Sequence, residues 1–160
     1  MLRIKIIAVG KIREKFLLEG IREYRKRLNT YVRLDIQELI DEPCPERISL
    51  AEEEKVKNKE GERILKSINS QDYVILLDLQ GKSFTSPGLA QHLDELALAG
   101  RSNITFIIGG SLGVSQEIQQ RANLRLSFSK LTFPHTLMRL ILLEQLYRAM
   151  KISRGEPYHK

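Results

Sequence analysis

Three apolar runs rich in β-branched residues constrain the fold of this chain most strongly. They cover residues 3–9, 73–79 and 103–108, and none alternates cleanly between apolar and polar side chains. A strand without that alternation is typical of a parallel sheet that is buried on both faces. The runs therefore predict a central sheet with helices on both sides.

Segments with helical periodicity separate these runs from one another. Two further strands are expected at residues 32–39 and 124–128, and helices at 14–28, 49–68, 86–99, 115–122 and from 134 onward. Five alternations of strand and helix predict an α/β fold, a mostly parallel sheet flanked by helices, in a single domain over residues 1–160.

Local signals mark several boundaries of these elements. Ser49 and Glu52 have the spacing of a capping box, and Ser86-Pro87 predicts an N-cap followed by proline at the first helical position. A turn is expected at Gln80-Gly81. Pro134 suits the first turn of the last helix, where its missing N–H costs nothing.

Three strand ends are predicted to converge on one site. Parallel α/β sheets bind ligands where their strands end, at the carboxyl edge. Those ends are Asp78 with Gln80, Gly109-Gly110 and the crossing over residues 129–133. The glycines permit close approach to the backbone, and apolar side chains line the crossing. A pocket for a flat aromatic group such as adenine is expected there.

The last helix is apolar around nearly its whole circumference, and a single sheet covers only one face of a helix. The second partner is expected to be another subunit, most often related by a twofold axis, with full burial inside one chain as the alternative. Arg139 lies among its apolar residues, so this charge is either paired or used.

Composition narrows the class of protein. The net charge is +6, and residues 1–33 carry ten Lys or Arg against three acidic residues. Residues 101–160 carry nine against three, which is a modest indication of a polyanionic partner, with a merely solubilising surface as the alternative. The single Cys44 has no disulfide partner, and no apolar run is long enough for a bilayer, so we expect a cytoplasmic protein. Isolated histidines predict no metal site.

Seven short segments, spread in order over the whole chain, resemble the ribosomal RNA large-subunit methyltransferase H family of the SPOUT (α/β-knot) class. They are Ala8-Val9-Gly10-Lys11, Lys59-Glu60-Gly61, Leu79-Gln80-Gly81-Lys82, Ile108-Gly109-Gly110, Leu126-Ser127-Phe128-Ser129 with Phe133-Pro134-His135, Leu146-Tyr147-Arg148-Ala149, and Pro157-Tyr158-His159-Lys160.

The resemblance implies an enzyme that uses S-adenosylmethionine to methylate N3 of a pseudouridine in helix 69 of 23S rRNA, within assembled 70S ribosomes. It also implies a homodimer with a C-terminal trefoil knot, and neither membrane nor metal as a partner. By matching position, the cofactor contacts are expected at Leu77, Gly109, Phe128, Ser129, Lys130, Leu131, Thr132 and Phe133.

The reaction itself suggests which other residues take part. An imide N3 must lose its proton before it attacks, so a base or a group that stabilises the anion is required. The candidates for catalysis are His135, Tyr158 and His159, and those for RNA binding are Arg139, Arg148, Arg154 and Lys160. The alternatives are a capping or packing role for His135 and a frayed terminus without function for the tail.

Three other functions fit parts of the sequence. A SPOUT methyltransferase with another RNA target, such as a tRNA ribose, is the nearest. A non-catalytic RNA-binding or ribosome-binding factor comes next. A flavodoxin-like carrier is disfavoured because Gly10-Lys11-Ile12-Arg13, after the first strand, is poor in phosphate-loop residues.

Overall fold

The computed structural model describes residues 1–160, which form a five-stranded sheet in which every strand pair is parallel. The strand order is β2-β1-β4-β3-β5. The strands are β1 (Arg3–Val9), β2 (Arg33–Leu39), β3 (Tyr73–Ser83), β4 (Asn103–Ile108) and β5 (Leu124–Ser127). The predicted parallel α/β sheet is therefore confirmed.

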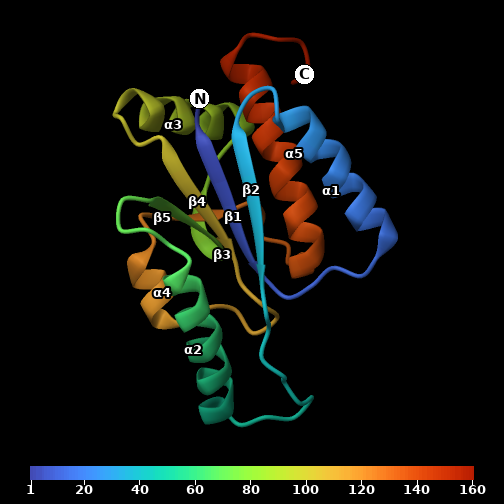
Figure 1. Cartoon of the computed structure of the whole chain (residues 1–160), viewed down its shortest axis with the longest axis vertical. Helices are drawn as coiled ribbons and strands as arrows, with labels where there is room; N and C mark the ends of the chain where they lie inside the picture. The colour runs from blue at the N-terminus through green and yellow to red at the C-terminus, as the bar shows by residue number, and fades with distance from the viewer.

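Helices cover both faces of the sheet (Figure 1). They are α1 (Lys15–Leu28), α2 (Leu50–Lys66), α3 (Ser86–Leu98), α4 (Gln116–Arg121) and α5 (His135–Ser153). Ile4, Ile6 and Ala8 of β1 belong to the core under α1, α3 and α5, whereas Ile7 and Val9 belong to the smaller core under α2 and α4. A run that is apolar at almost every position is required because both sides of the strand are buried.

Three of the predicted boundaries are wrong in detail. Thr85, not Ser86, caps α3, since its side chain accepts a hydrogen bond from the Gly88 amide at 3.0 Å. The β3 strand continues past the expected turn to Ser83, with a register shift against β5 between Leu77 and Lys82. Pro134 is the N-cap of α5 and lies outside its first turn.

The N-cap at Ser49 is confirmed, but the reciprocal half of the capping box is not formed, since Glu52 Oε1 accepts from Ser49 Oγ at 3.2 Å and not from the Ser49 amide. Ser49 Oγ accepts from the Glu52 amide at 3.1 Å, which satisfies one of the free N–H groups of the first helical turn. The helix then runs without a break through Gly61, which is buried beside Ser115.

The apolar α5 helix finds its second surface within the chain, because α1 and α3 both pack against it beside the sheet. Leu142, Leu143 and Leu146 are fully buried, while Leu137 and Ile141 stay half-buried. The subunit interface and the trefoil knot both stay predictions. None of the five helices is both long enough and apolar enough to span a bilayer.

Arg139 is paired inside the fold, so the prediction that it binds RNA is wrong. Only 3% of this residue is exposed. Its Nη1 donates to Glu38 Oε2 at 2.6 Å, and its Nη2 donates to the carbonyl oxygens of Val9 and Gly10 at 3.2 and 2.7 Å. The guanidinium thus ties α5 to the ends of β1 and β2 and does not reach the surface.

We expect Arg139→Met to lower the free energy of unfolding by about 2–3 kcal/mol, because hydrogen bonds to a charged group are lost and two buried carbonyl groups lose their donor. Urea denaturation measures the change. Arg154→Met, at an exposed position, is the matched control and should change stability by less than about 0.5 kcal/mol. Unchanged stability of Arg139→Met with weakened ribosome binding would restore the RNA-binding role.

Candidate active site

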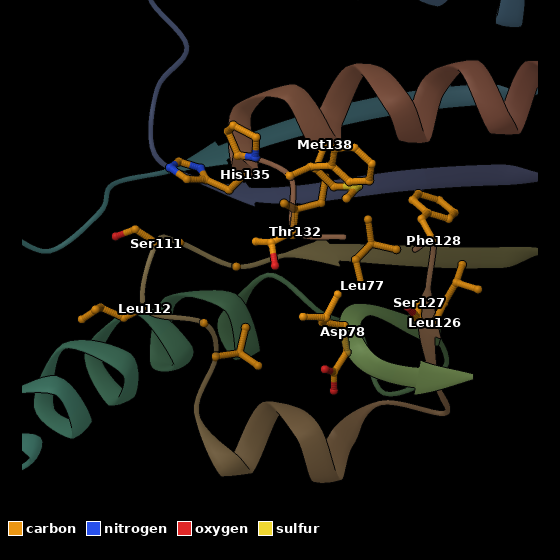
Figure 2. A pocket seen from close by; sticks show the side chains of 18 of the residues that line it. Leu77, Asp78, Ser111, Leu112, Leu126, Ser127, Phe128, Thr132, His135 and Met138 are labelled. Carbon is orange, nitrogen blue, oxygen red and sulfur yellow. The ribbon is translucent and has the colours of Figure 1, made fainter. Parts of the chain in front are cut away.

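A cavity of about 730 Å³ opens at the carboxyl edge of the sheet, where the three predicted strand ends converge. Leu77 and Asp78 of β3 follow the last residue that pairs with β4, and they line the cavity together with residues 109–114 of the loop after β4. The crossing after β5 adds Phe128, Ser129, Leu131, Thr132, Phe133 and Pro134. In Figure 2, Leu77, Leu126 and Phe128 lie at one end of the pocket and His135 and Ser111 at the other. The expected convergence of these segments is confirmed.

The loop after β4 has its shape because Gly109 carries no side chain. A Cβ at this position would lie 2.6 Å from Val114 Cγ1 and 3.3 Å from the carbonyl group of Gly113. Any larger residue must therefore push the 110–114 turn away from the sheet. The glycine allows this turn to fold back and form one wall of the cavity.

The crossing after β5 offers unused hydrogen-bond donors. Ser129 Oγ accepts from the Leu131 amide at 2.9 Å, and Ser127 Oγ donates to the Ser129 carbonyl oxygen at 3.1 Å. The amides of Thr132 and Phe133 donate to no protein acceptor. The crossing thus combines N–H groups that have no protein acceptor with apolar side chains, which is the combination that a purine base needs.

Seven of the eight expected cofactor contacts line this cavity, and Lys130 does not. The seven are Leu77, Gly109, Phe128, Ser129, Leu131, Thr132 and Phe133. Lys130 lies in the same crossing, but it is exposed and absent from the wall. Ser111, Leu112 and Met138 also line the cavity, and sequence reasoning missed them. Ser111 and Leu112 directly follow Gly109-Gly110, and Met138 lies one turn into the last helix, so their positions in the sequence could have predicted that they line the cavity.

His135 lies in the first turn of α5 and forms part of the wall of two cavities, the large one and an adjoining cavity of about 230 Å³ that Asp41 and Glu60 also line. Its Nδ1 is buried and has no hydrogen-bond partner. Burial lowers the pKa of His135, and the positive charge of Arg139 lowers it further. The imidazole is therefore held neutral, as a base must be.

The pKa of His135 predicts how stability depends on pH. Since its folded value lies below the unfolded value of 6.5, the folded protein binds fewer protons. The stability that His135 contributes is thus fully present above about pH 6.5 and declines as the pH falls through the folded pKa. We expect the wild type to lose more stability than His135→Gln between about pH 7.5 and 5.5 in urea titrations. An equal loss in both would contradict the shift.

Tyr158 and His159 lie far from the cavity within one chain. The tail is held at the opposite, amino edge of the sheet, where Tyr31 before β2 donates to Glu156 Oε2 at 2.6 Å (Figure 1). Tyr158 donates to Glu144 Oε2 at 2.7 Å. Burial raises the pKa of Tyr158, and its hydrogen bond to Glu144 raises it further. The structure therefore does not bring the tail candidates together with His135 inside one subunit.

The remaining basic candidates differ in whether their charged groups are already paired with other side chains. Arg148 Nε donates to Glu144 Oε1 at 3.0 Å, and its Nη1 lies 3.2 Å from His159 Nδ1. Arg154 is exposed, with its guanidinium 4.8 Å from the centre of the Tyr31 ring. Lys160 is exposed and has no ion-pair partner. Arg154 and Lys160 are thus available to a phosphate group.

Comparison with known proteins gives the class of this fold and site. The family described as "Predicted SPOUT methyltransferase" matches residues 2–159. A solved structure, a probable methylase family protein from Haemophilus influenzae Rd KW20, has a TM-score of 0.53 over 98% of this chain and 70% of that one. At 13% identity, this similarity concerns the fold alone. The molecule therefore belongs to the SPOUT class of methyltransferases.

Curated relatives show which family within this class the chain belongs to. Ribosomal RNA large subunit methyltransferase H of Desulfitobacterium hafniense (strain DSM 10664 / DCB-2) is 69% identical over the full length of both chains. The proteins of that name from Carboxydothermus hydrogenoformans and Enterococcus faecalis are 58% and 50% identical over 99% of this chain and all of theirs. The chain therefore belongs to the ribosomal RNA large subunit methyltransferase H family of SPOUT methyltransferases, as its resemblance predicted.

Proposed function

We propose that this protein transfers a methyl group from S-adenosylmethionine to N3 of a pseudouridine in helix 69 of 23S rRNA, in assembled 70S ribosomes. It would act in the cytoplasm as a homodimer of single-domain subunits, without a metal. The observation that carries the proposal is the cavity at the carboxyl edge, which combines an apolar wall, free backbone N–H groups and a glycine loop in a chain of this family.

The cavity fits the adenosyl part of this cofactor. Leu77, Phe128 and Met138 offer apolar surface to the adenine ring, and the free amides of Thr132 and Phe133 are suited to its ring nitrogens. Bound there, S-adenosylmethionine would supply an already activated methyl group. The protein then has to orient the acceptor nitrogen and remove its proton.

His135 is the proposed base. It lines the cavity, and its depressed pKa keeps it unprotonated at neutral pH. Tyr158 is unsuited to this task, because its raised pKa keeps the phenol protonated and its O–H is already given to Glu144. A role for Tyr158 in positioning or stacking on a base remains consistent with these contacts.

A second copy of the chain would bring the tail to the cavity. The α5 helix has 19 residues, about 28 Å at 1.5 Å per residue, and it carries the cavity at its start and the tail at its end. If Tyr158 and His159 take part in the reaction, they must reach the cavity of a partner subunit. A twofold dimer with antiparallel α5 helices satisfies this requirement for both copies at once.

Methyl transfer to separate acceptors tests the proposal. Purified protein and tritium-labelled S-adenosylmethionine are incubated with 70S ribosomes, free 23S rRNA or tRNA, and the modified nucleoside is identified by mass spectrometry. We expect incorporation into 70S ribosomes alone, at N3 of a pseudouridine. Incorporation into tRNA would favour a SPOUT enzyme with another target, and ribosome binding without cofactor affinity would favour a non-catalytic factor.

A further inference from the structure

Residues 156–159 are held by contacts with α5 and with Tyr31, which lies between α1 and β2, rather than frayed. Gly155 has a φ of +64°, a left-handed conformation that turns the chain back after α5. Beyond this turn, Glu156 Oε2 accepts hydrogen bonds from Tyr31 Oη and Lys151 Nζ, each at 2.6 Å. The bonds from Lys151 and Tyr31 lower the pKa of Glu156, so its carboxylate stays charged at neutral pH.

A second set of contacts holds Tyr158. Glu144 uses both carboxylate oxygens, one for Tyr158 Oη at 2.7 Å and one for Arg148 Nε at 3.0 Å. The Tyr158 ring lies edge-on to the ring of Tyr147. The Arg148 guanidinium lies 4.7 Å from the centre of the Tyr158 ring. Glu144 and Arg148 are only about a quarter exposed, so these interactions are partly shielded from water.

The contact between Arg148 and His159 determines where the imidazole carries its hydrogen. Arg148 Nη1 lies 3.2 Å from His159 Nδ1, and a guanidinium can only donate. Nδ1 must therefore accept, which places the hydrogen of the ring on Nε2. His159 is exposed, so this N–H is free to meet another molecule.

We propose that Glu144 and Arg148 are positioning residues that fix His159 as an Nε2–H donor, directed at a carbonyl oxygen of the deprotonated imide. This inference rests on the proposed function. When N3 loses its proton to a base, negative charge spreads onto the two flanking carbonyl oxygens, where a prearranged donor stabilises it. His159 keeps its hydrogen throughout, while the bond from sulfur to methyl breaks and the bond from N3 to methyl forms.

Nitrogen NMR tests the tautomer without any assay of activity. In long-range ¹H–¹⁵N spectra of the full-length protein with labelled histidine, His159 is assigned from the spectrum of His159→Gln. We expect a single Nε2–H form in the wild type and a mixture in Arg148→Met, which loses the donor but keeps an apolar stem. Arg154→Met is the matched control and should leave the spectrum unchanged. A hydrogen on Nδ1 in the wild type would overturn the proposal.

Methylation kinetics with 70S ribosomes test the role. We expect His159→Ala to lower kcat about a hundredfold, as the loss of one donor to a developing anion does elsewhere. His159→Gln, whose amide N–H reaches a similar point, should retain more activity, and Arg148→Met should lower kcat with an unchanged KM for ribosomes. A raised KM at constant kcat in Arg148→Met would overturn the assignment and make Arg148 a direct RNA contact.

The two proposals fail in different ways. If wild-type protein methylates no ribosomal RNA, the proposed function is wrong, whereas the NMR result still decides whether Arg148 sets the tautomer. If the wild type is active and His159→Ala is equally active, the proposed function stands and the donor role of His159 is refuted.

Discussion

Removal of residues 154–160 is expected to abolish methylation of 70S ribosomes, by about a thousandfold or more, while the affinity for S-adenosylmethionine changes less than about twofold. None of these seven residues lines the cavity of its own chain, so the cofactor keeps all of its contacts within that chain. The proposed donor at His159 and the free cations at Arg154 and Lys160 are lost together, and the effects of losing catalysis and RNA binding multiply. Calorimetric titration beside a tritium-transfer assay measures both quantities.

Replacing the same residues by a Gly-Ser segment of equal length separates the side chains from the length of the chain. This variant should be as inactive as the truncated one, because the contacts of Glu156 and Tyr158 that hold the tail are missing. Parallel losses of cofactor affinity and methylation in the truncated protein would show that the tail supports the fold of the cavity instead.

Substitution of Gly109 by leucine is expected to weaken cofactor binding about tenfold to a hundredfold without unfolding the protein. A Cβ alone would lie 2.6 Å from Val114 Cγ1, so the 110–114 turn must shift and the larger side chain takes space in the cavity wall. Overpacking of this kind costs about 1–3 kcal/mol, which corresponds to that range of affinity. Calorimetry measures the binding, and circular dichroism checks the fold.

A paired replacement shows whether the clash is the cause. Gly109→Ala should weaken binding less than leucine does, and adding Val114→Ala should recover much of that loss by removing the atom in closest contact. Undiminished affinity in Gly109→Leu would mean that the cofactor binds away from this loop.

Much of the fold follows from local pattern. The runs of β1 and β4 are buried on both faces, so their lack of alternation predicted parallel strands and hence one edge where the strand ends meet. That edge holds the cavity, which is why most of the expected wall is present. Local capping was harder to predict, because Thr85 and Ser86 are adjacent and equally able to cap.

The errors at Arg139 and the unforeseen contacts of the tail share a physical cause. Arg139 is paired with Glu38, which lies 101 positions away in the chain, and Tyr31 meets Glu156 across 125 positions. Such pairs cannot be predicted from periodicity or spacing in the sequence, because the residues meet only after folding has placed α5 beside β1 and β2. A buried charge predicted a partner, but only the fold identifies it.

The length of α5 has a consequence for genetics as well as for mechanism. In the proposed dimer, one subunit's cavity is completed by the other's tail, so a truncated chain is inactive alone and a Gly109→Leu chain is impaired at low cofactor concentration. Mixed dimers of the two would contain one wholly intact site, made from the cavity of the truncated chain and the tail of its companion. Coexpression of the two defective alleles should therefore restore part of the methylation that is lost with either allele alone at low cofactor concentration.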